Sequence, residues 1–337
     1  MTTTAANTSP SPTQRMHCME VWGGSRGVET SVVMAGLDAW VYSRPYGESA
    51  SGGDIHYVSS CATGRITRLL VADVSGHGQP VARMAEELRV LMGRYVNYLD
   101  QTEFVREMNQ RFAALAEIGC FATAVVMTFF GPNRHLSLCN AGHPPPLLYR
   151  KRTGRWSYLQ RSAQPQPAGA ERRSLANMPL GVEDLSSYEQ FGVRLSVGDL
   201  VVCYTDALLE ASNKDGRLLG QQGLLDVIRT LEFDDPASLV RALLKAIAVK
   251  HAGNLNEDDV TVLMFRPNGQ TPRGRARDRW LAPFRMMRGW VASLLPGGPP
   301  MARTEWNLAS IGGYFFDSLN QRWRREDPST QDDTDDS

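Results

Sequence analysis

Four aspartates stand in separate segments where an apolar run meets a turn. They are Asp54 in SGGD, Asp73 in LLVADVSGHG, Asp206 in VVCYTDALLEA and Asp258 in NEDDVTVLMF. Three of them end or border an apolar run and the fourth precedes one, so we expect all four at strand ends along one sheet edge. Carboxylates buried near one another cost several kcal/mol per charge unless a cation neutralises them. The four aspartates therefore predict one metal site.

The chemistry of the ligands indicates which metal. The set contains only oxygen donors, and neither a histidine pair nor a thiolate accompanies it. Such a set favours the hard ions Mg²⁺ and Mn²⁺ over zinc. Gly53, Gly76 and Gly78 lie beside these aspartates, where a residue without a β-carbon lets the backbone come close to an ion or reach positive φ.

The composition is that of an ordinary soluble protein. The 337 residues, 42% apolar and 21% charged, suffice for one large domain or two small ones. The formal net charge is zero, which argues against nucleic acid as a partner. The five cysteines form no C-x-x-C pair, the N-terminus lacks a signal-peptide pattern, and no apolar run is long enough to span a membrane. These features predict a cytoplasmic protein.

Glycine and proline divide the chain into apolar runs and helical patterns. An apolar run over 32–41 predicts a strand, and runs on both sides of the turn at 62–64 predict a hairpin. Helical spacing predicts one helix after Pro80 and another over 102–115. Because strands and helices are grouped rather than alternating, an α+β fold of antiparallel sheets covered by helices is expected. The remaining expected strands cover 121–130, 135–142, 145–151, two runs within 188–205, and 260–265, and the remaining helices cover 218–231 and 236–251.

Three regions are expected along the chain. Residues 1–19 are polar and predict disorder, 20–266 form a catalytic-type core, and 267–337 form an appendage with an acidic tail. Within the appendage, 271–295 carries six arginines among bulky apolar residues and predicts a basic amphipathic segment. Two interpretations of this segment stay open: peripheral contact with an anionic membrane, or packing on the core or on a second subunit of a homodimer.

Six motifs in a fixed order carry a family resemblance. SGGD, LLVADVSGHG, LCNAGHPPPLLY, MPLGV, GDLVVCYTDALLEASN and EDDVTVLMFR resemble the SpoIIE/RsbU-type branch of the metal-dependent (PPM, type 2C) serine/threonine protein phosphatases. The resemblance implies an αββα sandwich of two packed antiparallel sheets, with two Mn²⁺ or Mg²⁺ ions at one edge. It also implies a signalling hydrolase that removes phosphate from serine or threonine of a protein, such as an anti-sigma-factor antagonist.

The resemblance assigns roles to individual residues. Asp73 would bridge both ions, Asp54 would hold one of them, and Asp206 with Asp258 would hold the other. The backbone carbonyl of Val74 would be a further ligand.

Several neighbouring polar residues have less definite roles. His77 is either a proton donor to the leaving oxygen or a loop residue. Structural roles are favoured for Asn140, His143 and Asp199. Asp259 adjoins Asp258, but neighbouring strand residues point to opposite faces, and the resemblance selects Asp258.

Two positions depart from the family pattern. Tyr57 stands where members commonly have an aspartate, and Ala207 where they commonly have glycine. Neither change removes one of the four main aspartates, so activity is expected. The alternative is a catalytically weak pseudophosphatase that acts as a partner-binding regulatory module. Arg44, ahead of the Asp54 turn, is a candidate for holding the phosphate group.

Overall fold

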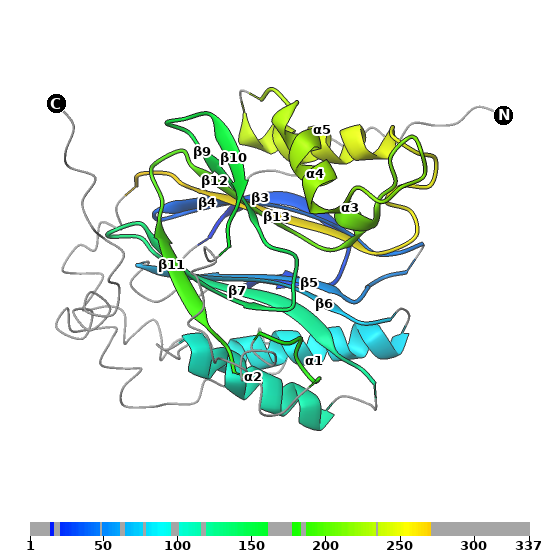
Figure 1. Cartoon of the computed structure of the whole chain (residues 1–337). Helices are drawn as coiled ribbons and strands as arrows, with labels where there is room; N and C mark the ends of the chain where they lie inside the picture. Colours follow the sequence, from blue (N-terminus) through cyan, green and yellow to red (C-terminus); the bar gives the residue numbers. More distant parts are fainter. Residues whose placement is uncertain are drawn as a thin grey trace, which may run out of the picture.

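Two β-sheets stack face to face, and helices cover both outer faces (Figure 1). The computed structural model describes residues 14–16, 21–47, 49–60, 65–76, 79–95, 101–115, 119–160, 177–182, 187–233 and 235–270. The α+β sandwich predicted from the sequence is confirmed. In this part of the chain, no helix is both long and apolar enough to cross a membrane.

The first sheet has seven strands in the order β1-β3-β4-β13-β12-β9-β10. All its neighbours are antiparallel except β1 and β3, which pair in parallel. Its strands are β1 (Gln14–Arg15), β3 (Val28–Met34), β4 (Leu37–Arg44), β9 (Leu147–Arg150), β10 (Arg155–Tyr158), β12 (Leu200–Tyr204) and β13 (Val260–Pro267).

The second sheet has six strands in the order β11-β8-β7-β6-β5-β2, all antiparallel. Its centre is the long ladder of β5, β6 and β7, which brings the ends of β5 and β6 to one edge of the sandwich. Its strands are β2 (Val21–Gly24), β5 (Asp54–Ser60), β6 (Ile66–Val74), β7 (Ala122–Phe130), β8 (His135–Ala141) and β11 (Gln190–Arg194).

Five helices complete the layers in the described part of the chain. α1 (Gln79–Tyr95) and α2 (Gln101–Leu115) cover the six-stranded sheet. α4 (Gly220–Arg229) and α5 (Pro236–Ala248) cover the seven-stranded sheet, and the single turn α3 (Ala207–Glu210) follows β12 directly. The Asp235 side chain caps α5 by accepting a hydrogen bond from the Ala237 N–H, and Pro236 begins the helix.

Strand alternation divides the buried side chains into three apolar layers. On β5, Ile55 and Tyr57 pack beneath α1 and α2, whereas Val58 faces the other sheet. The layer between the sheets includes Leu263 of β13, and a third layer lies between the seven-stranded sheet and α4 and α5. The central strands are therefore buried on both faces, which explains why their sequences are continuous apolar runs.

The structure differs from the predicted elements at several points. The apolar run over 32–41 is a hairpin of β3 and β4, because Gly36 takes a φ of 86° and reverses the chain. β2 and β10 were not predicted. β1 lies inside the segment expected to be disordered, where pairing with β3 orders it and buries Met16. The turn at 62–64, His77 and the segment 271–295 lie outside the described residues.

Candidate metal centre

Asp54 and Asp73 lie opposite each other on neighbouring strands. Asp54 begins β5, Asp73 is the next-to-last residue of β6, and the antiparallel register pairs them directly. Because paired residues project to the same face of a sheet, the two carboxylates leave the sheet together. The Thr205 hydroxyl, just beyond β12 of the other sheet, donates a 2.8 Å hydrogen bond to Asp54 Oδ2. The pair therefore faces the space between the two sheets.

Asp54 is enclosed, with 4% of its surface exposed. Burial is the main cause that raises the pKa of its carboxyl well above the usual value, and the charges of Asp73 and Asp259 raise it further. The hydrogen bond from Thr205 opposes this shift by stabilising the charged form. Thr205 is itself held, because its hydroxyl accepts the Thr261 N–H at 3.0 Å. A buried carboxylate is thus oriented by a fixed donor from the other sheet.

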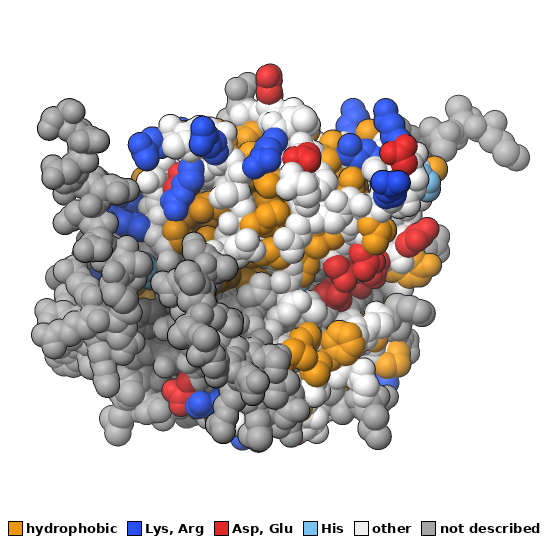
Figure 2. Space-filling view, in the orientation of Figure 1, with side chains coloured by type: hydrophobic (Ala, Val, Ile, Leu, Met, Phe, Trp, Pro, Cys, Tyr) orange, Lys and Arg blue, Asp and Glu red, His pale blue; other side chains and the backbone are white. Residues whose placement is uncertain are grey.

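The Asp73 carboxyl interacts electrostatically with the other acidic side chains. Burial raises the pKa of its carboxyl to about 7, and the negative charges of Asp206, Asp258, Asp259 and Glu210 contribute in that order. Figure 2 shows a compact group of acidic side chains on the surface, at the level between the sheets and near α3. The structure therefore brings all four predicted aspartates within electrostatic range at one sheet edge.

Asp206 and Glu210 belong to one helical turn. Asp206 is the residue before α3, and its carbonyl accepts the Glu210 N–H at 2.9 Å. Burial raises the pKa of the Asp206 carboxyl, and the charge of Glu210 raises it further. Sequence reasoning missed Glu210. The signal was available, because residues four apart on a helix share a face.

The two adjacent aspartates, Asp258 and Asp259, have different surroundings. The Asp259 carboxylate is 6% exposed and accepts backbone N–H groups of Tyr46 at 2.5 Å, Gly53 at 2.6 Å and Asp54 at 3.4 Å. Asp258 is only half-buried, and its Oδ1 accepts the Asp259 N–H at 2.7 Å. Asp259 is therefore occupied with backbone donors, while Asp258 lies nearer to solvent and acts on Asp73.

Gly53 allows the chain to pass close to the Val74 carbonyl. A β-carbon at position 53 would lie 2.7 Å from the Val74 oxygen and 2.8 Å from Val81 Cγ1, well inside van der Waals contact. The Val74 N–H also donates to the Gly53 carbonyl at 3.3 Å. The SGGD turn therefore packs directly against the carbonyl that was predicted as a ligand.

The two departures from the family pattern are accommodated. Tyr57 is 1% exposed and lies on the face of β5 opposite Asp54, so its side chain belongs to the core beneath α1 and α2. Ala207 is the first residue of α3, a position that suits a good helix former. Neither residue enters the space between Asp54 and Asp73.

The remaining polar residues of the motifs have structural positions. His143 is buried, its Nδ1 lies 2.8 Å from the Thr123 hydroxyl, and its backbone exchanges two hydrogen bonds with the Asn140 amide. The Asp199 carboxylate accepts the N–H groups of Lys151 and Ser196 and pairs with Arg150, which fixes two turns.

The carboxylates fit a divalent cation by their chemistry. In the described part of the chain, no lysine or arginine forms an ion pair with Asp54, Asp73 or Asp206. No three Asp, Glu, His or Cys side chains among these residues converge closely enough to enclose an ion. Acidic side chains that raise one another's pKa are thus gathered at one edge, and the donors are all oxygen, as Mg²⁺ and Mn²⁺ prefer.

The sequence also matches a known family. The family described as Stage II sporulation protein E (SpoIIE) matches residues 63–268. The chain is similar to the phosphoserine phosphatase RsbU of Bacillus subtilis (strain 168), with 20% identity over 231 residues. This match covers 68% of the chain and 63% of the relative, which is less than two thirds of the relative's length.

Solved structures share the fold. The RsbU and RsbW domains of a Mycobacterium tuberculosis protein align with a TM-score of 0.55 and 24% identity, over 80% of this chain and 71% of that one. The PP2C phosphatase domain of SpoIIE from Bacillus subtilis, with a fragment of its regulatory domain, aligns with a TM-score of 0.54 and 16% identity, over 74% and 64%. At these identities the likeness establishes the two-sheet architecture.

Proposed function

This chain belongs to the SpoIIE family of serine/threonine phosphatases, and from this premise we propose that it hydrolyses phosphoserine or phosphothreonine on a protein, using two Mn²⁺ or Mg²⁺ ions. The observation that carries the proposal is the direct pairing of Asp54 and Asp73 across the β5–β6 ladder, at a sheet edge where Asp206 and Asp258 lie within electrostatic range of Asp73. Repulsion between neighbouring carboxylates destabilises a fold unless a bound cation offsets it.

The pattern of charges supports a central position for Asp73. The charges of Asp73 and Asp259 raise the pKa of Asp54, and the charges of Asp206, Asp258, Asp259 and Glu210 raise the pKa of Asp73. Asp73 is therefore the residue that links the two groups of carboxylates. This supports the predicted roles, in which Asp73 holds both ions, Asp54 holds one, and Asp206 with Asp258 holds the other.

Neighbouring residues would hold the proposed metal ligands in position. When bound, two divalent ions supply an activated water and neutralise the oxygens of the phosphoryl group. Thr205 fixes the rotamer of Asp54, and Gly53 keeps the backbone packed against the Val74 carbonyl, a further proposed ligand. Asp259 fixes the loop that begins β5 through its backbone hydrogen bonds. The role of His77 as proton donor stays a prediction.

The substrate we propose is a phosphorylated regulatory protein, such as an anti-sigma-factor antagonist. Similarity to a relative named phosphoserine phosphatase and to a structure that joins RsbU and RsbW domains supports this class of substrate. The formal net charge of the chain is zero, which gives no support to a nucleic-acid substrate.

A phosphatase assay tests the proposal. We expect the purified chain to hydrolyse p-nitrophenyl phosphate and a phosphoserine peptide with Mn²⁺ or Mg²⁺, and to stop when EDTA is added. Asp73→Asn should lose activity by orders of magnitude. Calorimetry separates the alternatives: a chain that binds the ions without turnover is a pseudophosphatase, and a chain that binds neither ion at millimolar concentration has no metal centre.

A further inference from the structure

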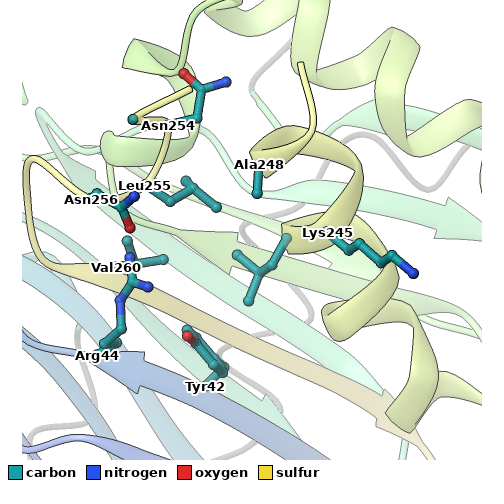
Figure 3. A pocket seen from close by; sticks show the side chains of 10 residues that line it. Tyr42, Arg44, Lys245, Ala248, Asn254, Leu255, Asn256 and Val260 are labelled. Atoms are coloured by element: carbon teal, nitrogen blue, oxygen red, sulfur yellow. The ribbon is translucent and has the colours of Figure 1, made fainter. Parts of the chain in front are cut away.

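A cavity of about 280 Å³ lies on the outer face of the seven-stranded sheet, beneath the end of α5 (Figure 3). Its walls come from β4, β13, α5 and the loop that follows α5. Its floor is apolar and its rim is polar. The residues that line it are Tyr42, Arg44, Leu244, Lys245, Ala248, Gly253, Asn254, Leu255, Asn256 and Val260.

Arg44 is the distinctive residue of this cavity. Its register partner is Val260, and its side chain rises from β4 toward Asn256 in Figure 3. It is half-buried, and its guanidinium forms no hydrogen bond or ion pair with the residues that the structure describes. A guanidinium carries five N–H donors, and at this half-buried position they are available to a bound acceptor. No carboxylate lines the cavity to accept them.

The amide of Asn256 adds a second polar group opposite Arg44. Its side chain is exposed and makes no hydrogen bond within the described part of the chain. Its neighbour Asn254, in contrast, is anchored by hydrogen bonds to the Ser212 backbone and the Ile247 carbonyl. Lys245 lines the opposite wall, but its ammonium points away from Arg44 in Figure 3. Among the described residues that line the cavity, the Arg44 guanidinium and the Asn256 amide therefore offer donors without a protein partner, and the Tyr42 hydroxyl adds a third.

We propose that this cavity binds an oxyanion, a phosphate or carboxylate group, through the Arg44 guanidinium and the Asn256 amide. The fork of an arginine matches the two oxygens of such a group. The apolar floor of Leu244, Leu255 and Val260 accommodates a short aliphatic stem attached to the anion. The site is distinct from the carboxylate centre, because Arg44 faces α5 while Asp54 faces the space between the sheets.

One loop connects the two sites. Asn256 belongs to the anion site, and Asp258 and Asp259, two and three residues later, belong to the carboxylate centre. The loop is constrained at its start, because Asn254 is anchored and Leu255 holds a φ of 64°, which is rare for a residue with a side chain. An anion held by Asn256 therefore fixes the segment that positions Asp258.

Calorimetry on the full chain tests this site. The protein is kept in EDTA, so that no metal ion binds the probe, and is titrated with inorganic phosphate and separately with a short peptide that carries one glutamate. We expect millimolar or tighter binding of at least one probe, weakened at least about ten-fold in Arg44→Gln, as expected for a charge-assisted pair. Asn256→Ala, at an exposed position, should weaken binding several-fold without affecting the fold. Lys250→Gln, two residues after the end of α5 and not among the residues that line the cavity, is the control for lost charge.

The two probes identify the source of the anion. Tighter binding of the peptide, with the same dependence on Arg44, assigns the site to an acidic side chain of a partner protein. Tighter binding of inorganic phosphate assigns it to a free anion. If neither probe binds, or if folded Arg44→Gln and Asn256→Ala bind as wild type does, the proposal is wrong.

Discussion

Asp73 lies directly across the β5–β6 ladder from Asp54, and its charge raises the pKa of the Asp54 carboxyl. Two like charges in register are unfavourable for a sheet. The arrangement is tolerated because most of the other residues of the ladder are apolar, and nearly all of them are buried. The edge of the sandwich therefore carries a local instability that is separate from the stability of its core.

Removing the Asp73 charge should stabilise the metal-free protein. A carboxyl whose folded pKa is raised to about 7 favours folding when protonated, and this contribution is lost as pH rises from about 3.8 through 7. At pH 8 in EDTA, Asp73→Asn should thus raise the free energy of unfolding by roughly 1–4 kcal/mol, and the gain should shrink toward pH 4. Chemical denaturation at both pH values measures it.

A control variant and a measurement with added metal test this prediction further. Asp215→Asn, in an exposed turn, should leave stability within about 0.5 kcal/mol of wild type. Addition of Mn²⁺ should raise the melting temperature of wild type more than that of Asp73→Asn. A loss of stability in Asp73→Asn at pH 8 would show that the carboxylate has a favourable partner in the folded state.

Asp258→Asn should reduce metal binding, whereas Asp259→Asn should reduce stability. Asp258 faces the carboxylate centre, so Asp258→Asn should lose most metal-dependent activity and metal affinity while keeping its melting temperature. Asp259 accepts three backbone N–H groups, and the amide of Asn can satisfy only part of them, so Asp259→Asn should lose about 1–3 kcal/mol of stability. Thermal unfolding and calorimetric metal titration separate the two effects. Equal loss of metal affinity in both variants would show that Asp259 is also a ligand.

Gly53→Ala should disturb the carbonyl of Val74. The added methyl group would lie 2.7 Å from the Val74 oxygen, so either β6 or the SGGD turn has to move. Overpacking of this kind costs about 1–3 kcal/mol, and we expect weaker metal binding as well. Gly27→Ala is the matched control, because its β-carbon would meet only Pro45 Cδ at 3.5 Å and the Ser43 carbonyl oxygen at 3.8 Å. If Gly53→Ala has the same free energy of unfolding and the same affinity for Mn²⁺ as Gly27→Ala, the close approach has no functional importance.

Acid should unfold the protein partly through His143. Burial lowers the pKa of this imidazole to about 3, against an ordinary value of 6.5. As pH falls below 6.5, the unfolded chain takes up the proton that the folded chain refuses, so stability is lost between about 6.5 and 3. His143→Gln should therefore show a shallower loss of stability over this window, although it is less stable at pH 7. A slope in His143→Gln identical to that of wild type would refute the assignment.

Periodicity and turn chemistry predicted much of the fold. The amphipathic patterns of α1, α2, α4 and α5 and the apolar runs of β5, β6, β7 and β13 all correspond to observed elements. The hairpin of β3 and β4 was missed, because Ala35 and Gly36 interrupt an apolar run without any polar turn residue. β10 was missed because its four residues alternate too briefly to give a pattern.

The candidate site was predictable only in part. The frames of Asp54, Asp73, Asp206 and Asp258 were visible, since each carboxylate lies beside an apolar run. The role of Asp259 was not visible, because its partners are backbone N–H groups, which leave no pattern in side-chain sequence. The place of Arg44 depends on which face of β4 meets α5, and this is set by the packing of distant elements.

The hydrogen bonds of Asp259 have a mechanical consequence. Asp259 immediately precedes β13 of one sheet, while Gly53 and Asp54 stand at the start of β5 of the other. The Asp259 carboxylate therefore connects the two sheets at the edge where the acidic side chains lie. Charge-assisted bonds of this kind resist sliding of one sheet over the other. The width of this edge is therefore already set before a phosphoprotein of the kind we propose binds.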